Sequence, residues 1–223
     1  MKIWHLVFVV TVFLMAIKSA QPEPLSAPDV KNLLARIREI RAATPHVQAD
    51  FREEKTIRLL NKPVVSSGKV WFQAPNKFRR EVKGNFPSLT VSNGHDLWIY
   101  YPNFKSAEHY SLGKRSPVDA AITTINTALN LENVENTFSI SGAKIDNRYA
   151  LELSPRASSM RRLFAEFKLQ LNAEFFAERT EMVQANGDRV VTTYSNQTRA
   201  PIPATQFEFS PPPGTEITTP LGR

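Results

Sequence analysis

The sequence predicts an α+β fold that is mainly β, built on a single antiparallel sheet with two inserted helices. The Asn-Gly pairs at 93–94 and 186–187 each separate two apolar runs, which is the strongest short-range signal for a β-hairpin. Between residues 68 and 83, apolar side chains alternate with polar ones, the period of a strand whose two faces differ. Successive hairpins of this kind predict a meander whose sheet is long enough to curl.

The first predicted element is an amphipathic helix that begins near Ser26 and ends before Thr44-Pro45. Ser26 and Asp29 have the spacing of a capping box, and a proline lies between them in the first turn. Apolar residues then recur at helical spacing with basic residues between them, at Val30, Leu33, Leu34, Ile37 and Ile40.

Strands and a second helix follow. The segment 47–60 places Val47, Ala49 and Phe51 on one face, and the meander follows it. A helix predicted from Ser116 to Leu129 interrupts the β pattern, because Val118, Ile122 and Ile125 recur at helical spacing. Strand signals resume at 149–153, at 163–171, in the two runs around Asn186-Gly187, and in a last short strand at Phe207 and Phe209.

Residues 1–20 have the features of a secretory signal. Lys2 precedes an apolar segment, 6–17, that is too short to span a membrane comfortably. We expect cleavage near Ala20, which leaves residues 21–223 as a single domain; an uncleaved anchor is the alternative. If the organism is bacterial, the mature chain is expected in the periplasm. The sequence has no cysteine, which excludes disulfides, thiolate metal sites and a lipid-modified cysteine anchor.

The formal net charge of +7 includes Lys2 and Lys18 of the signal. The remaining basic residues are scattered through strands and loops, so the charge does not predict a nucleic-acid partner. On an exported protein it is more simply interpreted as a surface for acidic partners or anionic lipid head groups.

No catalytic or metal-binding constellation is visible. His46, His95 and His109 lack metal-ligand spacing, and neither a Gly-x-Ser-x-Gly motif nor a phosphate loop occurs. His95-Asp96 could form half of a catalytic pair, but polar residues are expected at a turn tip for other reasons. An exported hydrolase is therefore disfavoured, and we expect no enzyme activity, metal or cofactor.

The apolar side chains of the strands admit two interpretations. Phe72, Phe78, Trp98 and Phe167 could simply fill a closed barrel. Alternatively, a loosely fitting helical cover over a curved sheet leaves an apolar cavity for lipid chains. Burial of acyl chains contributes about 0.8 kcal/mol per CH₂, so a carrier needs no directional chemistry.

With these residues in view, the chain resembles the LolA family of periplasmic lipoprotein carriers. Order and spacing agree from about residue 26 to 217. The resemblance rests on four segments in register: Val47-Gln-Ala-Asp-Phe51, Gly68-x-Val-Trp-Phe-x-x-Pro-Asn76, Val91-Ser-Asn-Gly-His-Asp-Leu-Trp-Ile-Tyr100 with Pro102, and Phe207-x-Phe-x-Pro-Pro212.

The resemblance implies an unclosed antiparallel β-barrel with a helical lid. It implies a soluble, monomeric carrier that receives acylated lipoproteins from an inner-membrane ABC transporter and passes them to an acceptor at the outer membrane. The residues expected to line the apolar cavity are Leu33, Leu34, Ile37, Phe51, Val70, Phe72, Phe78, Leu89, Val91 and Phe167. Those expected in the lid are Val118, Ile122, Ile125 and Leu129. The alternatives are a protein of the same fold that binds another lipid or glycolipid, or one that senses mislocalised lipoproteins.

One position departs from the family pattern. Well-known members carry an arginine just before the Pro-Asn of the second strand, where it hydrogen-bonds the lid and holds it shut. Here that position is Ala74. Either another basic residue, such as Arg80 or Arg115, latches the lid, or the lid is not latched in this way.

Overall fold

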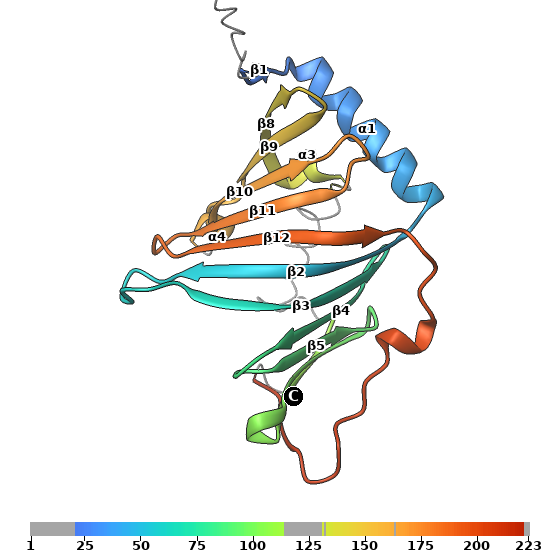
Figure 1. Cartoon of the computed structure of the whole chain (residues 1–223), viewed down its shortest axis with the longest axis vertical. Coiled ribbons are helices and arrows are strands. Elements are labelled where there is room, and N and C mark those ends of the chain that lie inside the picture. Colours follow the sequence, from blue (N-terminus) through green and yellow to red (C-terminus); the bar gives the residue numbers. More distant parts are fainter. Residues whose placement is uncertain (1–20, 114–130, 132, 163, 221–223) are drawn as a thin grey trace, which may run out of the picture.

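The computed structural model of the chain describes residues 21–113, 131, 133–162 and 164–220. Its strands form one curved 13-stranded sheet (Figure 1). In spatial order the strands are β1 (Glu23–Pro24), β8 (Phe138–Ile145), β9 (Arg148–Pro155), β10 (Phe164–Leu171), β11 (Ala177–Gln184), β12 (Arg189–Thr198), β2 (His46–Thr56), β3 (Val64–Gln73), β4 (Lys77–Lys83), β5 (Ser88–Ser92), β6 (Asp96–Tyr101), β7 (Ser106–Ser111) and β13 (Glu216–Thr218).

The predicted single, unclosed antiparallel sheet is confirmed, with one local difference. Neighbouring strands are antiparallel except for β13, which pairs parallel to β7. The edge strands β1 and β13 do not pair with each other, so the sheet of the described residues stays open. Both Asn-Gly hairpins are present, between β5 and β6 and between β11 and β12.

The helix α1 (Ala27–Ala43) begins where the capping box predicts. The Ser26 Oγ accepts a hydrogen bond from the Asp29 backbone amide at 3.3 Å, and the Asp29 carboxylate accepts one from the Ser26 amide at 3.3 Å. Its apolar stripe, Val30, Leu33, Leu34 and Ile37, is buried. In Figure 1, α1 lies along the β8–β11 part of the sheet. We call the face that α1 covers the inner face.

The main core fills the inner face beneath α1. The apolar stripe of the helix packs there against side chains of β8, β9 and β10, including Phe138, Leu151, Leu153, Phe167, Leu169 and Leu171. Apolar burial of this size is the main stabilising contribution to the fold. The core ends near β11, so the helix covers only one part of the inner face.

Pairing across the sheet shows which residues share the inner face. Phe72 of β3 lies opposite Phe78 of β4 and Val47 of β2. Val70 lies between Ala49 and Arg80 in the same way. The odd-numbered residues of β3, such as Trp71, lie on the opposite face, which we call the outer face.

The outer face has its own cover. After β12 the chain runs back past β4 and β5, as the red segment of Figure 1 shows. The short helix η2 (Ala204–Phe207) lies against β4, where the Gln206 carbonyl accepts a hydrogen bond from Arg79 Nη1 at 3.3 Å. Phe209 contacts Trp98 and Tyr100 of β6, with ring centroids 6.0 and 5.5 Å apart.

This segment corrects one prediction. The last short strand at Phe207 and Phe209 is wrong, because Phe207 closes η2 and Phe209 belongs to no strand. Alternating aromatic residues next to prolines resemble a strand, but here they cover a sheet face instead of extending its edge. The sheet instead gains β13 further along the chain.

The remaining described helices are single turns: α3 (Val134–Thr137), α4 (Ser158–Arg161) and η1 (Pro102–Phe104). No helix among the described residues has both the length and the apolar character needed to cross a membrane. The expected signal at 1–20 and the expected helix at 116–129 lie outside the described residues.

Gly68 is required where β3 and β4 approach each other. A Cβ atom there would lie 1.7 Å from the carbonyl oxygen of Glu81 and 3.0 Å from Phe51 Cε1. We therefore expect Gly68→Ala to lower the free energy of unfolding by about 1–3 kcal/mol, as overpacking does elsewhere. Urea unfolding checks this value, with Ser67→Ala, an exposed neighbour in the same strand, as the control. Equal midpoints for both variants would contradict the close approach.

Candidate binding cavity

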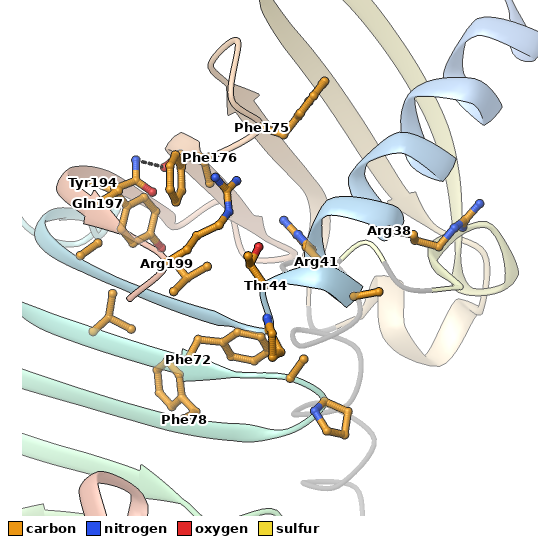
Figure 2. A pocket seen from close by; sticks show the side chains of 18 residues that line it. Arg38, Arg41, Thr44, Phe72, Phe78, Phe175, Phe176, Tyr194, Gln197 and Arg199 are labelled. Atoms are coloured by element: carbon orange, nitrogen blue, oxygen red, sulfur yellow. Dashed lines mark hydrogen bonds between the residues drawn. The ribbon is translucent and has the colours of Figure 1, made fainter. Parts of the chain in front are cut away.

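A cavity of about 460 Å³ opens beside the main core, where α1 ends and the inner face continues across β12, β2, β3 and β4. Its volume lies within the range of small-molecule sites, roughly 300–1,000 Å³. The strands contribute apolar and aromatic side chains to its lining: Val47, Ala49, Val70, Phe72, Ala74, Phe78 and Tyr194. Figure 2 shows Phe72 and Phe78 side by side on neighbouring strands.

A smaller cavity of about 200 Å³ continues along the same face toward β10 and β11. The two cavities share Val70, Phe78 and Tyr194 in their linings. The smaller one adds Phe51, Phe167, Met182 and Val190, which are apolar, and several polar residues. Together the cavities form an elongated, largely apolar space over the part of the inner face that α1 leaves uncovered.

An ion pair lies at the inner end of this space. Arg80 Nη2 lies 2.9 Å from Glu53 Oε2, and the guanidinium carbon of Arg80 lies 4.3 Å from the centroid of the Phe51 ring. Thr192 donates to the same carboxylate oxygen at 3.4 Å. Burial raises the pKa of the Tyr194 phenol, which faces both cavities. The space is mainly apolar, and these groups make its inner end polar.

Arginine side chains line the opposite end. Arg38 and Arg41 come from the last turns of α1, and Arg199 comes from the segment after β12 (Figure 2). Arg38 is paired with Glu135 at 2.9 Å. Burial, and then the charge of Arg199, lowers the pKa of Arg41 to about 10. Burial also lowers the pKa of Arg199. This end of the cavity is therefore lined by three basic side chains.

The larger cavity is lined mainly by apolar and basic side chains. Among the described residues that line the larger cavity there is no histidine, aspartate or glutamate. No group of three or more potential metal ligands occurs within the described ranges. His109, which pairs with Asp96 at 2.7 Å and stacks on Trp98, lies on the outer face. The site can hold an apolar ligand of elongated shape.

The structure brings part of the expected cavity lining together. Phe51, Val70, Phe72, Phe78 and Phe167 all lie on the two cavities. Leu33, Leu34 and Ile37 lie instead in the main core beneath α1. The expected lid residues Val118, Ile122, Ile125 and Leu129 lie outside the described residues, as does Arg115.

The assignment of Leu89 and Val91 to the cavity is corrected by the strand register. Leu89 pairs with Glu81, and Val91 pairs with Arg79, whereas the cavity residues Phe78 and Arg80 pair with Ser92 and Thr90. Leu89 and Val91 therefore lie on the outer face. The pattern of β5 is misleading because its apolar residues lie under the cover of the C-terminal segment and its hydroxyl residues face inward.

Several lining residues were missed by the sequence-based prediction. Tyr194, Thr192 and Val190 share one face of β12, so the period-2 pattern of that strand contained a signal for them. Arg41 and Arg199 had no such signal. They belong to elements far apart in the sequence, and only the folded chain brings them to one cavity.

Comparison with known proteins places the chain among carriers. Residues 43–210, which include every strand from β2 to β12, match the family described as outer membrane lipoprotein carrier protein LolA. An outer-membrane lipoprotein carrier protein from Dechloromonas aromatica is 26% identical over 179 residues, 78% of this chain and 81% of that protein. One from Coxiella burnetii is 21% identical over 204 residues, 92% and 90% of the two chains.

The fold itself recurs in solved structures. An uncharacterized conserved protein from Thermus thermophilus superposes with a TM-score of 0.52 at 14% identity, over 85% of this chain and 98% of that one. At this identity the likeness concerns the fold alone.

Proposed function

This chain belongs to the LolA family of outer membrane lipoprotein carrier proteins, and on that premise we propose that its cavity shelters the acyl chains of lipoproteins. The protein acts as a carrier, not as an enzyme. It moves its cargo through the periplasm, from the inner to the outer membrane. An inner-membrane lipoprotein-releasing ABC transporter supplies the cargo, and an outer-membrane acceptor receives it.

One observation supports this proposal most directly: an elongated apolar cavity over the part of the inner face that α1 does not cover. Phe72, Phe78 and Val70 give its floor a continuous apolar surface. Each acyl CH₂ moved from water into such a space contributes about 0.8 kcal/mol. A chain of ordinary length therefore supplies enough binding free energy without specific polar contacts.

A release assay tests the proposal. Inner-membrane vesicles that contain the releasing transporter and a tagged lipoprotein are supplied with ATP and with this protein lacking residues 1–20. We expect the acylated lipoprotein to appear in the supernatant as a complex with the protein. The matched control is the same lipoprotein with its acylated cysteine replaced by serine, which should form no complex. A supernatant without lipoprotein, at any concentration of the carrier, would contradict the proposal.

A further inference from the structure

One end of the sheet gathers the exposed large apolar side chains of the described residues. Because the strands from β2 to β7 are antiparallel, the β2–β3 hairpin, the β4–β5 turn and η1 between β6 and β7 all lie at this end (Figure 1). The side chains are Leu59, Leu60, Val64, Val65, Phe86, Phe104 and Ile217. Single exposed apolar side chains are common, but a gathering at one end indicates an interaction site. We call this surface the Leu59 end.

Hydrogen bonds between neighbouring turns hold the Leu59 end together. Asn103 Nδ2 in η1 donates to the Asn85 carbonyl of the β4–β5 turn at 3.0 Å. The backbone amide of Arg58 in the β2–β3 hairpin donates to Asp188 Oδ1 of the β11–β12 turn at 3.0 Å. The exposed apolar side chains therefore project from turns that are fixed to one another.

The same turns carry positive charge. Residues 57–63, 83–87 and 102–105 contain no acidic residue, and their basic residues are all exposed: Arg58, Lys62, Lys83 and Lys105. Of the carboxylates nearby, that of Asp188 is buried, and Glu216 lies next to Ile217. The Leu59 end therefore combines exposed apolar side chains with an excess of positive charge.

This combination fits a lipid surface better than a protein partner. Leu59 is 93% exposed and lies between Arg58 and Lys62, so an apolar tip has a cation on each side. Apolar side chains enter the boundary between head groups and acyl chains, while long basic side chains reach the lipid phosphates. The centre of a protein interface is instead depleted in lysine.

We propose that the Leu59 end docks on the surface of a bilayer that contains anionic phospholipids. Leu59 and Leu60 enter the bilayer interface, and the basic side chains of the three turns contact the head groups. A few apolar side chains and charges give reversible binding, not a permanent anchor. The residues of the Leu59 end line neither cavity, so this inference goes beyond the proposed carrier function and is tested separately from it.

Sedimentation with vesicles tests the inference, using the protein without residues 1–20. We expect the wild type to bind vesicles of phosphatidylglycerol and phosphatidylcholine at least about tenfold more tightly than vesicles of phosphatidylcholine alone. Salt at about 1 M should remove this preference, because it screens the charges. The double variant Leu59→Ser/Leu60→Ser should bind the anionic vesicles about tenfold or more weakly, because two apolar side chains no longer enter the lipid.

A pair of lysine variants tests the contribution of charge. Lys62→Gln should weaken binding to the anionic vesicles about fivefold and leave binding to phosphatidylcholine unchanged. Lys144→Gln is the matched control, because Lys144 is exposed in β8 at the opposite end of the sheet. It removes the same charge and should not change the affinity. Equal effects of the two variants would mean that net charge, and not the Leu59 end, determines binding.

A tryptophan placed at the hairpin tip shows whether this end enters the lipid. The emission of Leu59→Trp should shift to shorter wavelength when anionic vesicles are added, after subtraction of the wild-type signal. Asn147→Trp, in the exposed β8–β9 turn at the opposite end, should show no shift. Shifts of equal size at both positions would contradict docking through the Leu59 end.

Binding of an acyl-chain fluorophore separates this inference from the proposed function. The Leu59→Ser/Leu60→Ser variant should bind the fluorophore as the wild type does, which also shows that it is folded. Wild-type protein that binds the fluorophore but does not sediment with anionic vesicles would overturn the inference and leave the carrier function standing. If that variant then also failed to release lipoprotein from inner-membrane vesicles, the Leu59 end would contact a protein instead of lipid.

Discussion

Phe72→Glu is expected to abolish binding of an uncharged acyl-chain fluorophore. Phe72 lies opposite Phe78 in the pairing of β3 with β4, and both line the larger cavity. A carboxylate placed on this apolar surface loses its hydration, and burial of an uncompensated polar group costs about 2–7 kcal/mol. The expected loss of affinity is therefore on the order of a hundredfold or more.

Gln73→Glu is the control for that experiment. Gln73 is the next residue of the same strand, pairs with Lys77, and lies on the outer face. The Gln73→Glu variant introduces the same charge on the face away from the cavity, so we expect its affinity for the fluorophore to equal that of the wild type. Phe72→Gln should also weaken binding strongly, which excludes an effect of charge alone through the nearby arginines. Equal affinities for the Glu variants at 72 and 73 would show that the acyl chain does not occupy this face.

Phe207→Ala is expected to cause the largest loss of stability, about 3–5 kcal/mol of unfolding free energy. The side chain is 1% exposed, and the helix η2 that carries it lies against β4 on the outer face. Truncation leaves a cavity beneath the C-terminal segment and weakens its hold on the sheet. Thermal or urea unfolding measures the loss, with the 78% exposed Phe86→Ala as the control.

A measurement of ligand binding distinguishes the role of the outer face from that of the inner face. At a temperature where the Phe207→Ala protein is still folded, we expect its acyl-fluorophore affinity to match that of the wild type, because Phe207 does not line either cavity. A change in stability below about 0.5 kcal/mol, similar to that of an exposed position, would mean that the outer face does not depend on this cover.

The resemblance implies an arginine just before Pro-Asn, and the residue at that position here is Ala74, which lines the larger cavity. Arg80, one of the expected substitutes, lies instead at the inner end of the smaller cavity with Glu53. The positive charge of the lining around position 74 comes from α1 and from the segment after β12. Among the described residues, the basic side chains that line the larger cavity therefore belong to elements other than β3.

The elements that depend on local interactions could be predicted from the residue pattern. Ser26 and Asp29 set the start of α1 through hydrogen bonds within one turn, and two Asn-Gly pairs set hairpins through backbone geometry. The alternation in β3 correctly separated Phe72 from Gln73, because the period of a strand is a property of its own backbone.

Long-range packing sets which face of the sheet each alternating set of side chains occupies and what covers that face. Leu89 and Val91 alternate with polar residues as regularly as Val70 and Phe72 do. Yet Leu89 and Val91 lie on the outer face, whereas Val70 and Phe72 lie on the inner face. Both faces of this sheet are covered, so each of them can hold an apolar set. The apolar stripe of α1 could equally have faced a cavity or a core, and packing against β8 to β10 placed Leu34 and Ile37 in the core. Likewise, Arg41 and Arg199 meet at one cavity only because the end of α1 and the segment after β12 converge there. Such convergence depends on long-range packing, which no local pattern of residues encodes.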